Sequence, residues 1–275
     1  MKKNFFGFLT AIFVIFIIAS PFAGASDIEL AKKSTLEKIL KRGELLIGTE
    51  SGYPPFEMTD KKGNIVGFDI DIAKEIAKAM GVKLKIINTA FDGIIPALTT
   101  KKFDIIISGM TITQERNLKI NFSDPYMIVG QTILLNKKYE GKITSYEQLN
   151  DQKYIVTSKL GTTGEQAIKR FIPKAQYKSF EGSGAAALEV AMGKADAIVY
   201  DLPFCATFIG TQGKNNLTFL DEPFTYEPLA FGIRKGDPDF LNWLNNFLRQ
   251  LKNDGRYDKI YKKWLNNMDW TKNVD

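Results

Sequence analysis

The chain has 275 residues, enough for two ordinary domains or one large one, and its 44% hydrophobic and 25% charged residues are typical of a soluble globular protein. It contains one cysteine and no histidine, which excludes an intrachain disulfide and a nucleophile activated by histidine, and argues against a zinc site. The formal net charge of +6 comes from scattered lysines without a basic block, so we expect no nucleic-acid partner.

The N-terminus predicts a secretory signal peptide over residues 1–25. Lys2 and Lys3 precede an apolar run at residues 5–18, and small residues at 23–25 have the spacing of a cleavage site. The alternative is a transmembrane anchor, but the apolar run is short for a membrane span. No cysteine follows the small residues, so we expect an exported, periplasmic protein that is not a lipoprotein.

The first half of the mature chain alternates strands and helices. We expect helices at residues 35–42, 67–80 and 93–100 and strands at 45–48, 84–87 and 104–108. This order predicts an α/β fold with a mostly parallel sheet, in which ligands bind at the carboxyl ends of the strands. Tyr53, Phe91 and Arg116 each follow such an end, so they can converge.

Acidic residues begin two of these helices. Asp92 is expected to cap the helix at 93–100. Asp69 and Asp71 lie in or beside the first turn of the helix at 67–80, where they complement the helix dipole. The alternative interpretation of Asp69 and Asp71 is a catalytic carboxylate pair.

The strand at residues 104–108 ends in groups that bind anions. A glycine is followed by the hydroxyls of Thr111 and Thr113, and Thr113 can cap a short helix that carries Arg116 in its first turn. Backbone N–H groups together with a guanidinium suit a planar carboxylate. The alternative is a surface arginine that pairs with Asp124.

The second half repeats the alternation, with strands expected at 131–135, 154–157, 197–200, 217–220 and 229–233. Residues 159–165 form a turn rich in glycine and threonine that opens a helix, a second place for an anion, but they lack the spacing of a Walker loop. Asp201 follows the strand at 197–200, and its alternative role is to cap the next helix.

Several motifs together resemble the family 3 solute-binding proteins, the periplasmic receptors for polar amino acids of ABC importers, and the glutamine-binding branch most closely. The motifs are Tyr-Pro-Pro-Phe at 53–56, Gly-Phe-Asp-Ile-Asp-Ile at 67–72, Phe-Asp-Gly-Ile-Ile-Pro-Ala-Leu at 91–98, Ser-Gly-Met-Thr-Ile-Thr at 108–113 with Arg116, Phe-Ser-Asp-Pro-Tyr at 122–126 and Gly-Thr-Thr-Gly at 161–164. The segment 196–201 and the tail 253–264 complete the set.

The resemblance implies the type II periplasmic-binding-protein fold, with two α/β lobes, a two-strand hinge and the ligand between the lobes. The first lobe would comprise residues 26–127 and 228–275, and the second lobe residues 128–227. The protein would be a monomer without a cofactor or metal that delivers a free amino acid to an inner-membrane ABC permease. An enzyme on the same scaffold, a periplasmic dehydratase, is the rival hypothesis.

The resemblance also implies how the amino and carboxyl groups of the ligand are held. Arg116 would bind the α-carboxylate, assisted by Thr111 and by backbone N–H groups near Thr111 and Thr163. Asp201 would bind the α-ammonium group together with the carbonyl of Gly109. The physical chemistry agrees, because each charge of a buried zwitterion has to be paired.

For the ligand side chain, the resemblance implies apolar walls from Tyr53 and Phe91, although many relatives have tryptophan at the second position. Glu50 and Lys159 match positions that contact the distal end. One acid and one base suit a carboxamide, so we expect glutamine to bind better than arginine or glutamate. If Glu50 dominates, the ligand is instead arginine, lysine or histidine.

Overall fold

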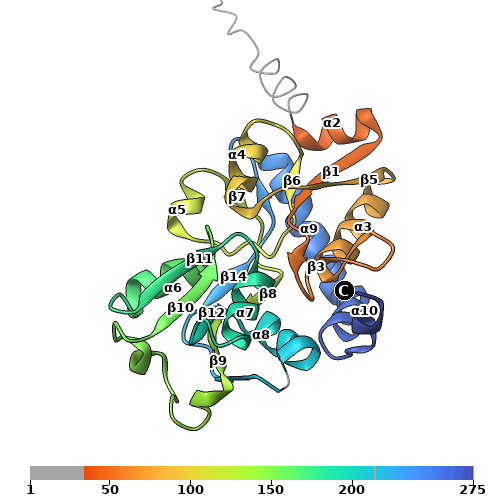
Figure 1. The fold of residues 1–275 in the computed structure, drawn as a ribbon. Coiled ribbons are helices and arrows are strands. Elements are labelled where there is room, and N and C mark those ends of the chain that lie inside the picture. The colour runs from red at the N-terminus through yellow and green to blue at the C-terminus, as the bar shows by residue number, and fades with distance from the viewer. Residues whose placement is uncertain (1–33, 214, 275) are drawn as a thin grey trace, which may run out of the picture.

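The computed structural model describes residues 34–213 and 215–274, which form two α/β lobes (Figure 1). The expected signal peptide, residues 1–25, lies outside the described residues. Each lobe contains a five-stranded sheet in which four strands point one way and one strand runs against them. The expected mostly parallel, two-lobe α/β fold is confirmed.

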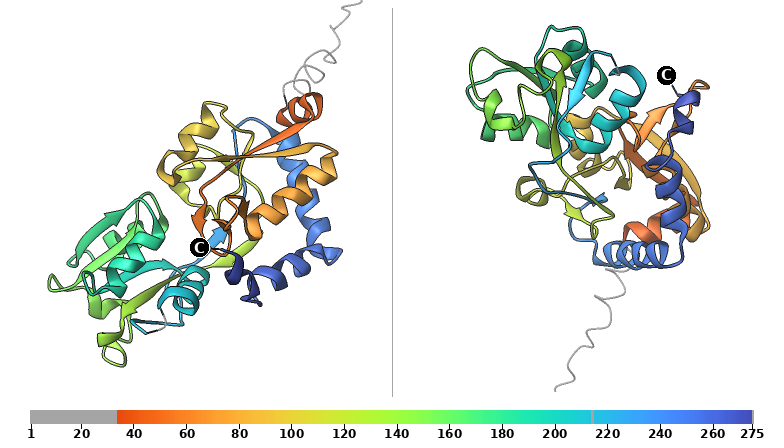
Figure 2. Two further views of the ribbon diagram at one scale, coloured as in Figure 1. Left: turned by 45° about the vertical axis from the view of Figure 1, so that its right-hand side comes forward. Right: turned by 90° about the horizontal axis from the view of Figure 1, so that it is seen from below.

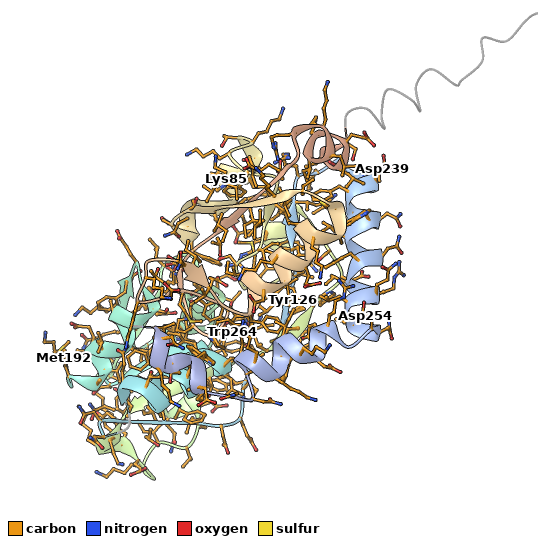
Figure 3. The ribbon with its side chains drawn as sticks, turned by 90° about the vertical axis from the view of Figure 1, so that its right-hand side faces the viewer. Lys85, Tyr126, Met192, Asp239, Asp254 and Trp264 are labelled. Atoms are coloured by element: carbon orange, nitrogen blue, oxygen red, sulfur yellow. The ribbon has the colours of Figure 1, made fainter. Side chains whose placement is uncertain are left out.

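The sheet of the first lobe has the order β5-β1-β6-β15-β7. Its strands are β1 (Glu44–Thr49), β5 (Lys83–Asn88), β6 (Ile105–Ile106), β7 (Asn121–Phe122) and β15 (Gly232–Ile233). Its helices are α2 (Thr35–Arg42), α3 (Phe68–Met80), α4 (Ile94–Thr99), α5 (Gln114–Asn117), α9 (Pro238–Asn253) and α10 (Arg256–Trp264). Figure 3 shows α9 between the labelled Asp239 and Asp254 along the outside of this lobe.

The sheet of the second lobe has the order β11-β10-β12-β9-β13. Its strands are β9 (Gln131–Asn136), β10 (Ile155–Lys159), β11 (Gln176–Phe180), β12 (Ala197–Asp201) and β13 (Leu217–Phe219). Its helices are α6 (Thr163–Phe171), α7 (Ser183–Ala191) and α8 (Leu202–Phe208). The edge strand β11 was not predicted, because its exposed, polar residues lack a hydrophobic pattern.

The chain crosses between the lobes at β8 (Met127–Val129) and β14 (Glu227–Leu229), which pair with each other antiparallel. Figure 2 shows the two lobes as separate bodies linked at this crossing. The single strand expected at residues 229–233 is therefore wrong. It is divided between β14 at the crossing and β15 in the first sheet.

Helix ends agree with the sequence at most positions. Gly43 and Gly81 end α2 and α3 in the left-handed conformation, with φ of 71° and 68°. The prediction that Asp92 caps a helix is wrong. Asp92 lies inside the short 3₁₀ turn η1 (Phe91–Gly93), and both this turn and α4 begin without a side-chain cap.

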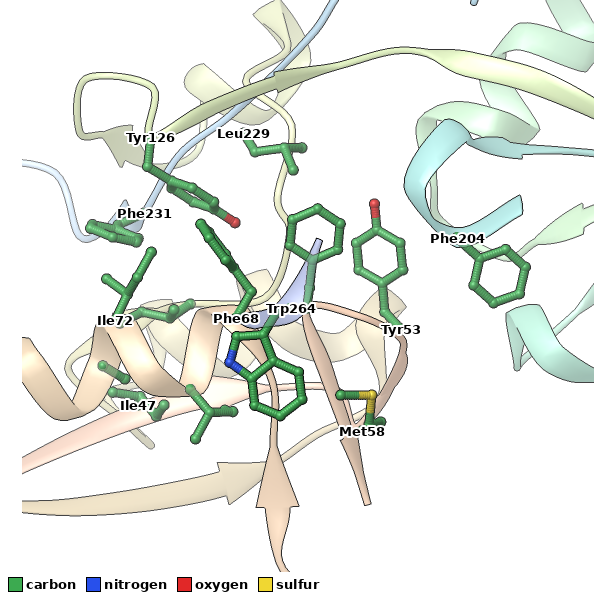
Figure 4. Packing of buried hydrophobic residues seen from close by; sticks show 14 of the residues in the cluster. Ile47, Tyr53, Met58, Phe68, Ile72, Tyr126, Phe204, Leu229, Phe231 and Trp264 are labelled. Carbon is green, nitrogen blue, oxygen red and sulfur yellow. The ribbon is translucent and has the colours of Figure 1, made fainter. Parts of the chain in front are cut away.

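The apolar core of the first lobe extends to the second lobe through Tyr53. A three-stranded sheet of β2 (Gly52–Tyr53), β3 (Glu57–Thr59) and β4 (Ile65–Val66) carries this residue. The Tyr53 ring stacks on Phe56 at 4.7 Å and lies 6.5 Å from the ring of Phe204, which belongs to α8 (Figure 4). The two lobes are thus in contact beside the strand ends.

Candidate functional site

Twelve residues from both lobes line one small cavity at the carboxyl ends of the parallel strands. All nine residues singled out from the sequence are among them, namely Glu50, Tyr53, Phe91, Gly109, Thr111, Arg116, Lys159, Thr163 and Asp201. The cavity has a volume of about 10 Å³, room for about one water molecule. An amino acid therefore enters this site only if the lobes or the side chains move.

Arg116 lies buried on α5 with most of its hydrogen-bonding capacity unused. Thr113 caps the helix as expected, and its hydroxyl accepts a hydrogen bond from the N–H of Arg116 at 3.1 Å. The guanidinium donates to the carbonyls of Thr111 at 2.9 Å and Gly161 at 3.1 Å, the latter in the second lobe. Its carbon lies 5.4 Å from the centre of the Phe91 ring. Among the described residues, two of its five N–H donors have a partner, so the other three are available to a carboxylate.

The alternative role of Arg116, a surface ion pair with Asp124, is wrong. Arg116 is 7% exposed, and within the described part of the chain no carboxylate forms an ion pair with it. Burial lowers the pKa of Arg116 from its usual value, yet a guanidinium remains charged in proteins. A buried cation of this kind favours an anionic ligand.

Asp201 ends β12 and receives donors from both lobes. Tyr53, on the first lobe, donates its hydroxyl to Oδ2, and Gln131 donates its amide N–H to Oδ1 at 2.5 Å. The alternative role of a helix cap is wrong, because the side chain makes no capping hydrogen bond to α8. Burial raises the pKa of Asp201 to about 7, although the hydrogen bonds from Tyr53 and Gln131 oppose this shift.

Lys159 and Glu50 form an ion pair across the cavity. Lys159 ends β10 in the second lobe, Glu50 follows β1 in the first, and their side chains are 1% and 18% exposed. The Lys159 ammonium lies 5.4 Å from the centre of the Phe91 ring, so Phe91 has two cations near it. Lys159 therefore points into the cavity and not towards solvent.

Thr163 and Thr111 are held by polar contacts of different kinds. The Thr163 hydroxyl accepts a hydrogen bond from Gln131 at 3.1 Å. Thr111 contributes its carbonyl to Arg116 and lies beside Leu229 in a β-bridge.

Position 109 requires a glycine because there is no room for a side chain and because the backbone has a positive φ. Its φ is +47°, and a Cβ atom at this position would lie 2.3 Å from the Tyr53 ring.

Four residues at or behind the cavity were missed from the sequence: Glu57, Gln131, Thr162 and Tyr200. Glu57 follows the Tyr-Pro-Pro-Phe motif directly, and Tyr200 precedes Asp201, so their proximity to known candidates was the available signal. No feature of the sequence indicates that Gln131 belongs to the site, because only its antiparallel pairing with Asp201 brings the two residues together.

Neither a metal site nor a membrane span is found within residues 34–213 and 215–274. These residues include no group of three or more potential metal ligands, and none of their helices is sufficiently long and apolar to cross a membrane.

A family model for bacterial extracellular solute-binding proteins, family 3, matches residues 45–267. The chain belongs to this family. Family 3 solute-binding proteins with similar sequences and structures are named for different amino acids. The glutamine-binding protein GlnH of the Bacillus subtilis ABC transporter is 34% identical over 273 residues, which covers 96% of this chain and 98% of GlnH.

Two solved structures are more similar in sequence. A proposed ABC-transporter binding component from Wolinella succinogenes, complexed with lysine, is 52% identical, with a TM-score of 0.82 and coverage of 84% of this chain and 99% of the other. The ancestral amino acid-binding protein AncCDT-1, a precursor of cyclohexadienyl dehydratase, is 53% identical, with a TM-score of 0.81 and coverage of 84% and 100%. These relatives are named as binding proteins, so this chain is an amino-acid-binding protein of an ABC transporter.

Proposed function

We propose that this protein captures a polar L-amino acid between its lobes in the periplasm and delivers it to an inner-membrane ABC permease. The observation that carries the proposal is the convergence of Arg116 and Asp201, a cation and an anion from different lobes, on one buried cavity. A zwitterion offers each of them its partner, and the buried charges then stabilise the closed arrangement of the lobes.

The α-carboxylate binds the unused donors of Arg116, with Thr111 and the N–H groups that begin α6 near Thr163. The α-ammonium group binds Asp201 and the carbonyl of Gly109. Supporting this arrangement, Asp201 has two oxygens that can accept further hydrogen bonds beside those from Tyr53 and Gln131. The lobes in this proposal comprise residues 26–127 with 228–275, and residues 128–227, with a cleaved signal peptide at 1–25.

The ligand side chain in this proposal is long and ends in an N–H donor. It has to be long to reach Glu50, which lies with Lys159 at one end of the cavity, and it has to donate because the Glu50 carboxylate accepts. Tyr53 and Phe91 form apolar walls for its methylene groups. Within that class we place glutamine first. The Lys159–Glu50 pair is partly buried and neutral as a whole, and a carboxamide can donate to Glu50 and accept from Lys159 without adding a charge.

A cationic amino acid is the second candidate, and one specific observation favours it. The lysine-complexed structure is 52% identical to this chain, compared with 34% for the glutamine-binding GlnH. A cationic side chain would bind Glu50 if Lys159 rotated out of the cavity, as long lysines do elsewhere.

A catalytic role is not proposed. AncCDT-1, the precursor of cyclohexadienyl dehydratase, is itself named as an amino acid-binding protein. Three carboxyl groups line the cavity, those of Glu50, Glu57 and Asp201. Glu50 and Asp201 have ligand-binding roles in this proposal, and Glu57 accepts a hydrogen bond from Ser108, so we assign none of them the role of a general acid or base.

Thermal-shift measurements against the twenty L-amino acids, followed by calorimetry of the hits, test the proposal. We expect stabilisation by glutamine or a cationic amino acid, and small-angle scattering should show a smaller radius of gyration at saturation. A protein that no amino acid stabilises, or whose radius is unchanged with ligand bound, would refute the proposed capture between lobes.

A further inference from the structure

Two carboxyl groups, Glu57 and Asp69, are buried at the candidate site, with 1% and 0% exposure. Glu57 lines the cavity and Asp69 lies behind it. One oxygen of each has clear donors. Asp69 Oδ2 accepts from the N–H of Gly109 at 2.7 Å and from the hydroxyl of Tyr126 at 2.9 Å. Glu57 Oε1 accepts from the hydroxyl of Ser108 at 2.7 Å.

The other oxygen of each carboxyl group has no donor in the part of the chain that the structure describes. Within the described residues, Glu57 Oε2 and Asp69 Oδ1 are inaccessible to solvent and have no hydrogen-bond partner. The backbone nevertheless brings the two side chains together. The N–H of Asp69 donates to the carbonyl of Phe56, the residue before Glu57, at 2.9 Å, and the donors to the two carboxyl groups, Ser108 and Gly109, are consecutive residues. Two ionised carboxylates cannot remain together in an apolar interior without a cation, whereas a single proton between them satisfies both oxygens.

We propose that Glu57 and Asp69 share one proton, with Glu57 Oε2 donating to Asp69 Oδ1, and that this pair positions the cavity wall at Glu50 and Gly109. The positioning part rests on the proposed function, whereas the shared proton does not. Asp69 is the ionised partner, because it accepts two other hydrogen bonds and lies in the first turn of α3, where the helix dipole favours an anion.

The Glu57–Asp69 pair is connected by hydrogen bonds to two residues that line the cavity, Glu50 and Gly109. The N–H of Glu50 donates to the Ser108 hydroxyl at 3.0 Å, and this hydroxyl donates in turn to Glu57. Asp69 holds the N–H of Gly109, whose carbonyl would bind the ligand ammonium group. Glu50 and Gly109 both line the ligand cavity, so the pair positions the site through them, in addition to Glu57, which lines the cavity as well.

The electrostatic surroundings agree with one retained proton. Burial raises the pKa of Glu57 well above its usual value and that of Asp69 to about 7. Other titratable groups that face the pair are Glu50, Lys159, Tyr53, Tyr126, Tyr200 and Tyr257. The charge of Glu50 favours the proton and that of Lys159 opposes it, while the tyrosines are neutral near pH 7.

Infrared spectroscopy of the ligand-free protein tests the proton directly. We expect a carboxylic-acid C=O band at neutral pH in the difference between the wild-type and Glu57→Gln spectra, from which the contribution of Asp201, with its pKa of about 7, is cancelled. The amide of Glu57→Gln can donate to Asp69 while its oxygen accepts from Ser108. Because the folded protein holds an extra proton, its stability falls as pH rises from about 4 towards the folded-state pKa. The unfolding equilibrium constant should thus increase up to about tenfold more per pH unit in the wild type than in Glu57→Gln.

Double-mutant analysis tests the geometry. In Asp69→Asn, the new N–H group can donate to Glu57, so each single variant keeps one hydrogen bond between the two side chains. Glu57→Gln with Asp69→Asn places two donors against each other, and we expect it to lose at least about tenfold more ligand affinity than the two single effects combined.

No carboxylic-acid band in the difference between the wild-type and Glu57→Gln spectra, equal pH slopes in the wild type and Glu57→Gln, or additive single effects would overturn the proposal. A band and a pH slope in a protein that binds no amino acid would refute the proposed function and leave the shared proton standing.

Discussion

Tyr53 on the first lobe donates its hydroxyl to Asp201 on the second, so the residue proposed to bind the ligand ammonium group has a partner across the cleft. This hydrogen bond lowers the pKa of Asp201, but burial outweighs it and raises the pKa to about 7. Ligand binding and protonation therefore compete for the same carboxylate.

Affinity is expected to depend on pH through Asp201. An ammonium group binds the ionised form, so below about pH 7 binding has to release a proton. We expect the affinity to fall up to about tenfold per pH unit as the pH decreases through this range. Calorimetry in buffers with different ionisation enthalpies measures the released proton.

Tyr53→Phe removes a hydrogen bond that lowers the pKa of Asp201, so the pH dependence should move to higher pH. Tyr200→Phe is the matched control, because Tyr200 lines the same cavity but its hydroxyl does not donate a hydrogen bond to the Asp201 carboxylate. Pronounced pH dependence in Asp201→Asn between pH 5 and 8 would contradict this assignment.

Arg116→Ala should abolish binding while the protein stays folded. Removing the guanidinium leaves a desolvated ligand carboxylate without its partner, at a cost of about 2–5 kcal/mol. Arg170→Ala, at an exposed arginine on α6, serves as the control and should change affinity by less than about twofold. Near-normal affinity of Arg116→Ala in calorimetry would exclude Arg116 as the carboxylate ligand.

Lys159→Met should change the preference among ligands. In the wild type we expect glutamine to bind better than arginine, with glutamate weaker than glutamine, because each charged side chain meets a like charge in the Lys159–Glu50 pair. Without Lys159, Glu50 is left unpaired, and arginine or lysine should become the better ligand by about tenfold or more. Competition calorimetry with these amino acids measures the order of affinity in the wild type and in Lys159→Met. Wild-type protein that binds arginine ten times more tightly than glutamine would instead support the cationic candidate.

Gly109→Ala should reduce both stability and affinity. The new methyl group would lie within 2.3 Å of the Tyr53 ring, and the positive φ disfavours any L side chain. We expect a loss of about 1–3 kcal/mol in the free energy of unfolding. Gly184→Ala, in a helix with open space around the new Cβ, should keep or raise stability. Unchanged chemical denaturation of Gly109→Ala would contradict the close packing.

Much of the site could be predicted because it depends on local order along the chain. Lys159 and Asp201 end β10 and β12, and Glu50 follows β1, all three being strands that short apolar runs identify. Parallel strands bring their carboxyl ends to one edge, so residues far apart in sequence gather there without further information.

Local patterns were insufficient wherever partners come from different elements. Asp92 and Asp201 both have the sequence of a helix cap, yet neither caps, because capping depends on backbone geometry at the helix start and on competing partners. The sequence prediction of one strand over residues 229–233 was wrong for a similar reason. It merged β14, at the chain crossing, with β15, because apolar composition does not show which strand a segment pairs with.

By itself the sequence determined the alternating α/β order, the two oppositely charged residues at strand ends and the glycine turn between β6 and α5. The tertiary structure alone decided that Gln131 reaches Asp201, that Lys159 stays inside the cavity with Glu50, and that Glu57 and Asp69 meet. These contacts depend on strand register and on the distance between lobes, which are set by the packing of the whole chain and have no signature in neighbouring residues.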